Sequence, residues 1–301
     1  MTKKKSPKSR SAPETWTLHP DRGFPAEKHA RAAAREIYAA TRTLPIVAPR
    51  TSVPMEWFGG EIPWNDPADF VIGSDHQLTS LIASFGQFTL AELGVIGKPP
   101  DSSVIVETDP RQIWKRFCES WPLLKARLPG LWIAAELVNV LGIRMEPGAK
   151  TAKLTYQQAS ETLAKKRFTP LQLLDHFDIE VLGTRQPKGA EGVPRLLAYE
   201  DLGGRVIPWS ATAQLTATPR LRALASLRSG IPNADLVWDS NGFVHDDGGF
   251  GTIPGRHDVA RRLDAGMLGG LVAEHRLDLA EAKQIAADLT YHLPLKSALA
   301  S

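Results

Sequence analysis

The sequence predicts an α/β protein whose strands run parallel. Short apolar segments rich in β-branched residues alternate with longer segments of helical periodicity, a pattern typical of a parallel sheet covered by helices. The chain has 301 residues, of which 43% are hydrophobic and 23% are charged, and this is enough apolar material for a sizeable core. The same composition excludes a wholly disordered chain, a collagen-like fibre and a disulfide scaffold.

The strands are predicted where apolar runs are short and bounded by turn-forming residues. They are Leu44–Ala48, Ile179–Gly183, Arg205–Trp209 and Leu236–Trp238. A full barrel of eight strands and eight helices usually takes about 250 residues before insertions. Because the segment from Ser74 to Lys166 is mostly helical, the remaining length does not comfortably hold one.

Helices are predicted from apolar periodicity and from capping residues at their starts. Thr108-Asp109-Pro110 combines a cap with a first-turn proline, Thr155 is predicted to cap a helix that runs to Lys166, and Asp278 with Glu281 forms a capping box. The other predicted helices are Ala26–Thr41, Pro219–Arg228 and Arg256–His275.

Basic residues gather at the start of the chain. The first 13 residues contain five basic side chains and no acid, whereas the whole chain has a formal net charge of +3, so residues 14–301 carry −2. We therefore predict that residues 1–13 form a disordered, solvated tail and that residues 14–301 form a single domain. A body without excess basic charge makes nucleic acid an unfavoured partner, with anchoring by the tail as a distant alternative.

Compartment and redox state follow from what the sequence lacks. No stretch of about 18 uninterrupted apolar residues occurs, which argues against a membrane span. Cys118 is the only cysteine, so disulfides within the chain and cysteine zinc sites are excluded. Cys118 lies in a helical pattern, where we expect a small buried side chain. The tail has no apolar core of a secretory signal, and we expect a cytoplasmic protein.

Six segments follow one another along almost the whole chain, from about Leu18 to Leu299. They are Leu18–Glu27 (LHPDRGFPAE), Leu44–Ser52 (LPIVAPRTS), Asn65–His76 (NDPADFVIGSDH), Glu107–Phe117 (ETDPRQIWKRF), His176–Arg185 (HFDIEVLGTR) and Thr252–Leu277 (TIPGRHDVARRLDAGMLGGLVAEHRL). This ordered series resembles the uronate (glucuronate) isomerases of the amidohydrolase superfamily. The resemblance rests on the series rather than on any single motif.

The resemblance implies a distorted TIM-barrel-like core, here incomplete, with a helical elaboration over about residues 74–166. It also implies aldose–ketose isomerisation of D-glucuronate or D-galacturonate in hexuronate catabolism. That reaction moves a proton between C2 and C1 through an enediol, and it needs a base, a proton donor and positive charge over the developing oxygens. The family uses a divalent metal, commonly zinc, to supply this charge.

The metal site departs from the family pattern. The family's first strand ends in a His-x-His pair whose side chains face the same way, but Arg50 and Ser52 stand at those positions here. Arginine has no acceptor atom and cannot ligate a cation. The resemblance leaves Asp246 as the sole matched metal ligand, or Asp247 if the alignment shifts by one residue. We therefore expect no metal cofactor and no catalysis by the family mechanism.

Three further positions lack the arginine that the family has near its substrate. Gly248 replaces the arginine of an Asp-x-Arg-x-Phe run, and Ser80 replaces the one that follows the Asp75-His76 pair. Ala211–Ala213 replaces an Arg-Pro-Asp run.

The resemblance also implies that a block of barrel strands, which the family has between the positions of Trp209 and Asp246, is missing here. Its loss exposes a strand edge beside Arg205–Trp209, which we expect a helix, a loop or another subunit to cover. The simplest partner is a second copy, giving a homo-oligomer.

These observations leave two functional hypotheses open. The first is a non-catalytic homologue that binds a sugar acid or serves in an assembly. The second is an active isomerase of a uronate or a related sugar acid with a rearranged site, in which Asp246 and His76 are the candidate catalytic residues. Arg50 and His76 are the candidate substrate-binding residues, because a guanidinium can hold a carboxylate bidentately.

Each candidate also has a structural interpretation. Arg50 is then a salt-bridged relic, His76 a packed histidine, and His245–Asp247 a set of solvated loop residues. His257 and Asp258 are interpreted as structural, with Asp258 favourable at the N-terminus of the predicted helix.

Overall fold

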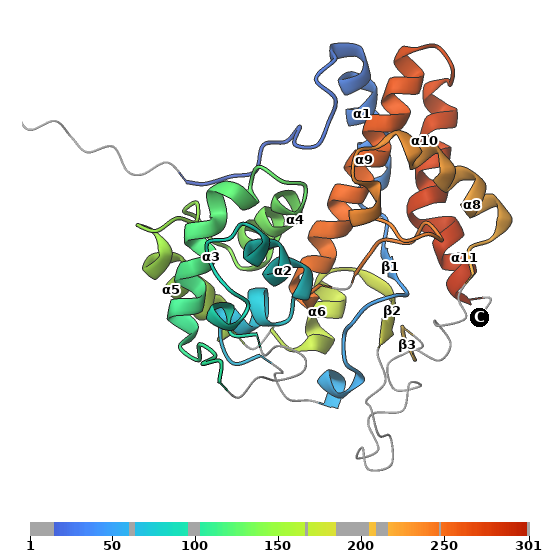
Figure 1. The fold of residues 1–301 in the computed structure, drawn as a ribbon. Helices are drawn as coiled ribbons and strands as arrows, with labels where there is room; N and C mark the ends of the chain where they lie inside the picture. The colour runs from blue at the N-terminus through green and yellow to red at the C-terminus, as the bar shows by residue number, and fades with distance from the viewer. Residues whose placement is uncertain are drawn as a thin grey trace, which may run out of the picture.

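The computed structural model describes residues 15–59, 64–95, 103–165, 168–184, 205–208, 216–246 and 248–299. It combines many helices with a small parallel sheet (Figure 1). The predicted tail over residues 1–13, Trp209 and the Ala211–Ala213 replacement lie outside the described residues.

The sheet contains strands β1 (Ile46–Ala48), β2 (Ile179–Thr184) and β3 (Val206–Pro208), in the order β1-β2-β3. Both pairings are parallel, with Val47 opposite Val181 and Leu182 opposite Val206. Three of the four predicted strands are therefore present, with shifts of one or two residues at their ends. Parallel pairing also agrees with the predicted fold class.

The fourth predicted strand, Leu236–Trp238, is wrong. The chain forms a 3₁₀ turn over Ala234–Leu236, and Trp238 pairs only through a single antiparallel bridge with Val244. The apolar character of this segment has another cause, because the Trp238 ring is buried under the guanidinium of Arg228, 4.3 Å from its centroid. Between residues 216 and 246, which the structure describes in full, the chain folds into helical elements and adds no strand to the sheet.

Helices α2 to α6 lie between β1 and β2 in the chain, and this stretch between the two strands contributes most of the buried aromatic side chains. The helices are α2 (His76–Ser84), α3 (Pro110–Leu124), α4 (Pro129–Ala135), α5 (Ala152–Leu163) and α6 (Pro170–His176). Asp109 caps α3 as predicted, with its side chain accepting from the backbone N–H of Arg111. Cys118 is fully buried on α3, as predicted.

Thr155 is not the helix cap that the sequence predicts. Helix α5 begins three residues earlier, and Thr155 is buried within it. Its hydroxyl donates to the backbone carbonyl of Thr151 and accepts from the indole N–H of Trp114, at 3.1 and 3.0 Å. These two partners satisfy the hydroxyl inside the helix, which is why it does not act as a cap.

The other described helices are α1 (Lys28–Thr41), α8 (Pro219–Ala225), α9 (Ile253–Ala273), α10 (Leu279–Ala287) and α11 (Leu293–Leu299). Short 3₁₀ segments cover Met55–Gly59, Ala91–Leu93, Ser226–Gly230 and Phe250–Thr252, and π-helical turns cover Asp69–Gly73, Glu136–Val140 and Asp288–His292. The predicted capping box of Asp278 and Glu281 at the start of α10 is confirmed.

Helices α1 and α9 pack closely along their length (Figure 1). Gly269 makes this approach possible, because a Cβ at this position would lie 2.5 Å from the backbone oxygen of Ala30 and 2.9 Å from the backbone nitrogen of Ala34. Ala30, Ala34 and Ile37 are all buried on the facing side of α1. Small side chains on both helices thus bring their backbones together.

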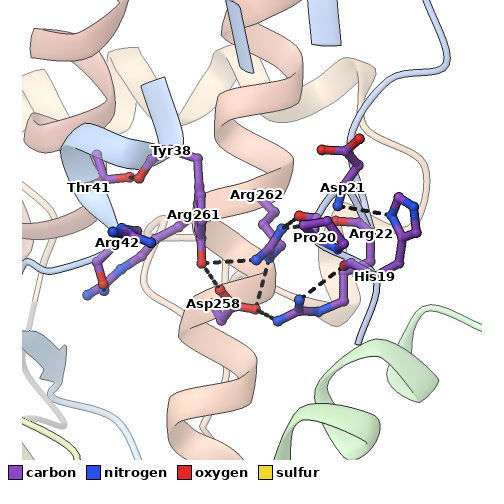
Figure 2. A network of polar contacts seen from close by, with 10 residues as sticks. All are labelled: His19, Pro20, Asp21, Arg22, Tyr38, Thr41, Arg42, Asp258, Arg261 and Arg262. Atoms are coloured by element: carbon purple, nitrogen blue, oxygen red, sulfur yellow. Dashed lines mark hydrogen bonds and ion pairs between the residues drawn. The ribbon is translucent and has the colours of Figure 1, made fainter. Parts of the chain in front are cut away.

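Asp258 is the centre of a polar network that ties the N-terminal segment to α1 and α9 (Figure 2). Its carboxylate accepts hydrogen bonds from Arg22, from the Tyr38 hydroxyl and from Arg262. Because α9 begins at Ile253, Asp258 lies beyond the first turn of the helix. The expected interaction with the helix N-terminus is therefore wrong, whereas its structural role agrees with the interpretation from sequence.

Candidate functional site

The end of β1 lies beside Asp246. Thr51, between Arg50 and Ser52, forms an isolated parallel bridge with Asp246, and its hydroxyl donates to the backbone oxygen of Gly183 at 2.7 Å. The backbone therefore brings together three positions that the sequence singled out for metal or substrate binding. Asp247, the alternative match, lies outside the described residues.

Asp246 is buried, with only 1% of its surface exposed. Its Oδ2 atom lies 3.0 Å from Nε2 of His257 on α9, whose side chain is 3% exposed. The other carboxylate oxygen, Oδ1, has no hydrogen-bond partner among the described residues. The interpretation of Asp246 as a solvated loop residue is therefore wrong, because the bridge to Thr51 and the imidazole draw it into the protein.

Arg50 forms an ion pair with Asp239, with 3.1 Å between Nη1 and Oδ2 and with 30% of the arginine side chain exposed. Asp239 is fixed by its own turn, since its Oδ1 accepts from the backbone N–H groups of Asn241 and Phe243. Sequence reasoning missed Asp239, although Asp-Ser-Asn-Gly is a typical turn sequence in which an aspartate bonds to the backbone ahead of it. The salt-bridged interpretation of Arg50 matches this geometry.

The donors at this strand end do not fit the divalent metal that the resemblance implies. Arg50 supplies only N–H donors, and one oxygen of Asp246 is engaged by His257. Over the described ranges of the chain, no group of three or more His, Cys, Asp or Glu side chains is arranged to hold a metal ion. Divalent cations in proteins are bound by several converging carboxylate or imidazole ligands, and one carboxylate cannot replace them.

His76 is the first residue of α2 and is exposed to solvent. Within the described parts of the chain, no hydrogen bond or ion pair joins its side chain to Arg50 or to Asp246. The structure therefore does not assemble the three candidates of a rearranged site through direct polar contacts. The preceding residue, Asp75, is buried instead and caps α2 by accepting from the N–H of Leu78 at 2.9 Å.

Arg256 is the most highly connected side chain near this strand end, and sequence reasoning missed it. It is 2% exposed, and its guanidinium lies over the ring of Trp132 at 4.8 Å from the centroid. Its polar partners come from three parts of the chain: Asp75 at 3.2 Å, Gln77 at 3.0 Å, the backbone oxygen of His245 at 3.0 Å and Thr252 at 3.1 Å.

Gly248 explains how this cluster can form. A Cβ at position 248 would lie 2.5 Å from Nη2 of Arg256 and 2.6 Å from Oδ2 of Asp75. Since any side chain there would collide with this ion pair, the arginine that the resemblance predicts at this position could not be introduced without displacing the pair. A glycine at position 248 thus leaves room for the buried Arg256–Asp75 pair.

Glu136 is an isolated carboxyl group behind Arg256. It is fully buried, and neither of its oxygens has a hydrogen-bond partner among the described residues. Burial raises the pKa of Glu136 well above its usual range, the nearby Asp75 raises it further, and Arg256 opposes the shift. Burial therefore favours the neutral form of this carboxyl group. The apolar sequence from Leu131 to Ile143 indicates that Glu136 is buried, but it does not indicate that the carboxyl group lacks hydrogen-bond partners.

The chain was compared with known proteins, and no family model matches it. It is 32% identical to the uronate isomerase of Rhizobium meliloti (strain 1021) over 275 residues, which is 91% of this chain and 52% of that protein. It is 34% identical over 196 residues to the uronate isomerase of Cutibacterium acnes, covering 64% of this chain and 40% of the relative. The chain thus spans about half the length of the curated relatives it matches.

Solved structures show the same fold. The glucuronate isomerase of Caulobacter crescentus superposes with a TM-score of 0.73 at 20% identity, over 95% of this chain and 97% of that one. The uronate isomerase of Thermotoga maritima gives a TM-score of 0.64 at 12% identity, over 94% and 99%. At these identities the likeness concerns the fold alone. None of the helices in the described residues is long and apolar enough to cross a membrane.

Proposed function

This chain belongs to the uronate isomerase family, and from that premise we propose that it is a shortened member that binds a sugar acid without isomerising it. The observation that carries the proposal is the strand end beside Asp246, where Arg50 pairs with Asp239 at 3.1 Å. Arg50 and Ser52 occupy the positions at which the resemblance predicts two histidines. We infer that the three-stranded sheet is what remains of a distorted, incomplete TIM-barrel core.

The loss of isomerisation follows from what these side chains can do. Moving a proton between C2 and C1 needs an accessible base and positive charge over both oxygens of the enediolate. Asp246 is buried against His257, so its carboxylate is not presented to a substrate. His76 is accessible but shares no direct polar contact with Asp246 or Arg50 within the described residues, so no base and acid face one another.

Binding of a sugar acid is supported by Arg50. Its side chain is 30% exposed, and a guanidinium can hold a carboxylate through two parallel hydrogen bonds. The ion pair with Asp239 holds the Arg50 guanidinium near the strand end. A uronate carboxylate would compete with Asp239 for this guanidinium. This competition predicts modest affinity.

An active isomerase with a rearranged site is the second candidate. One observation favours it: Oδ1 of Asp246 is buried without a hydrogen-bond partner among the described residues, next to the bridge with Thr51. In such a site Asp246 would act as the base, His76 would transfer the proton after a movement of α2, and Arg50 would hold the carboxylate.

Proton NMR of the full chain with D-glucuronate in D₂O, without and with zinc, separates these candidates. Saturation transfer to the sugar without loss of the C2 proton supports binding without isomerisation. Loss of the C2 proton and appearance of the ketose would overturn it in favour of the active enzyme, and no transfer at all would overturn binding. Arg50→Gln should abolish the transfer, whereas Arg276→Gln, in an exposed ion pair with Glu274, should leave it unchanged.

We also infer that a second copy of the chain covers the sheet beside β3. In the order β1-β2-β3 this strand is the last of the described strands, and an uncovered edge invites pairing with another chain. Sedimentation velocity should show a dimer or a larger oligomer, and a monomer at micromolar concentration would contradict this inference.

A further inference from the structure

A cavity of about 320 Å³ opens between α2, α4 and the segment Asn233–Leu236. Its volume lies in the range of small-molecule sites, which are mostly apolar with a few polar groups that fix orientation. We propose that it binds a small carboxylic acid with an aromatic or aliphatic body, whose carboxylate pairs with Arg127 at the mouth. This proposal is independent of the sugar-acid site at Arg50.

The apolar walls of the cavity indicate that the body of the ligand is apolar. They are formed mainly by Leu78 and Leu81 of α2, by Leu128, Trp132 and Ile133 at α4, and by Leu236. Gln77 also lines the cavity, but its side-chain oxygen already accepts from Arg256. Sugar hydroxyl groups placed against such walls would lose water without gaining partners, which costs free energy for each group. An apolar ring or chain meets no such penalty.

The charge of the ligand follows from the ion pairs around the cavity. Three charged side chains line it: Asp75, Arg127 and Arg256. Asp75 and Arg256 neutralise one another at 3.2 Å, and the second oxygen of Asp75 accepts from the N–H of Leu78. The charge that remains in the lining is the guanidinium of Arg127, so the cavity carries a net positive charge and favours an anion.

Arg127 is placed to receive a carboxylate. It is exposed, and its guanidinium carbon lies 5.9 Å from the centroid of the Phe85 ring. Among the residues that the structure describes, no carboxylate lies within ion-pair distance of it. Stacking on an aromatic ring limits the motion of a guanidinium while leaving its N–H groups for a planar anion.

A matched pair of probes tests the proposal with the full chain. Isothermal titration calorimetry should show binding of 3-phenylpropionate and weaker binding of 3-phenylpropionamide, which has the same body without the charge. Arg127→Gln should weaken binding of the acid about tenfold, equal to about 1.4 kcal/mol, and leave the amide unchanged. Arg111→Gln is the control, because Arg111 is also exposed and lies 5.5 Å from the ring of Tyr156, away from the cavity.

A second variant tests the place of binding. Leu81→Trp puts an indole into the cavity and should abolish binding of both probes, while circular dichroism shows the fold retained. Failure of the acid to bind the wild-type chain would overturn the proposal. So would equal binding of acid and amide, an unchanged affinity in Arg127→Gln, or displacement of the acid by D-glucuronate. The last outcome would assign the cavity to the sugar acid. The proposal that this chain binds a sugar acid would then still stand, with its site in the cavity instead of at Arg50.

Discussion

The imidazole of His257 lies 3.0 Å from the carboxylate of Asp246, and both side chains are almost completely buried. This contact joins the second turn of α9 to the residue that bridges the end of β1 through Thr51. The carboxylate that the resemblance predicts as a metal ligand therefore has a structural partner in this chain. It stabilises the junction between the sheet and α9, the longest of the helices that the structure describes.

Asp246→Ala should destabilise the fold strongly. Removal of one member of a buried hydrogen-bonded pair leaves the other without its partner, and such losses cost about 1–3 kcal/mol. Urea denaturation should show this decrease in the free energy of unfolding. Glu274→Ala is the matched control at an exposed ion pair, and it should change the free energy by less than about 0.5 kcal/mol. Equal effects of the two substitutions would contradict a structural role for the pair.

Restoration of the two histidines should not restore isomerisation. In the double variant Arg50→His and Ser52→His, the Asp246 carboxylate still faces His257, and Asp239 loses its arginine partner. Conversion of D-glucuronate in the presence of zinc should therefore stay at the wild-type level when followed by NMR. Formation of the ketose by a folded double variant would show that the two histidines were all that the site lacked.

Glu136→Gln should stabilise the protein increasingly as the pH rises. Because burial raises the native pKa of Glu136, its contribution to stability is complete below the unfolded value of 4.5 and is lost as the pH rises toward the native value. Glutamine does not titrate. The free energy of unfolding of the variant, relative to the wild type, therefore rises by up to about 1.4 kcal/mol per pH unit in that window. Urea unfolding between pH 4 and 8 measures the difference, and a gap that does not change with pH would contradict it.

Cys118 should be inert to thiol reagents in the native protein. Burial raises the pKa of its thiol to about 11, and the thiolate is the reactive form. Ellman's reagent at pH 8 should therefore label no thiol in the folded chain and one thiol per chain in guanidinium chloride. Rapid labelling of the native protein would mean that α3 opens readily around this residue.

Local signals predicted the elements well. Asp109-Pro110 and the pair Asp278–Glu281 start helices because their capping bonds lie within four residues of one another. Leu236–Trp238 failed as a strand because three apolar residues cannot distinguish a paired strand from a turn buried under Arg228. Burial of Thr155 against Trp114 likewise depends on a distant helix.

The candidate site could be predicted only in part. Arg50, Ser52 and Asp246 were found because a family pattern marks their positions, and the bridge from Thr51 to Asp246 brings them together. No family pattern identifies the positions of their partners and neighbours Asp239, His257 and Arg256. Arg256 reaches Asp75 across roughly 180 residues of sequence, a distance over which pattern and propensity give no information.

The close packing of α1 on α9 through Gly269 has a consequence for biosynthesis. The two helices are separated by roughly 200 residues, which a ribosome translates in roughly 10–40 seconds. During that time the buried face of α1, with Ala34 and Ile37, has been made but has no surface to cover it. Helix α1 is thus made long before the helix that covers it, and a chaperone that shields α1 during translation would protect this apolar face until α9 arrives.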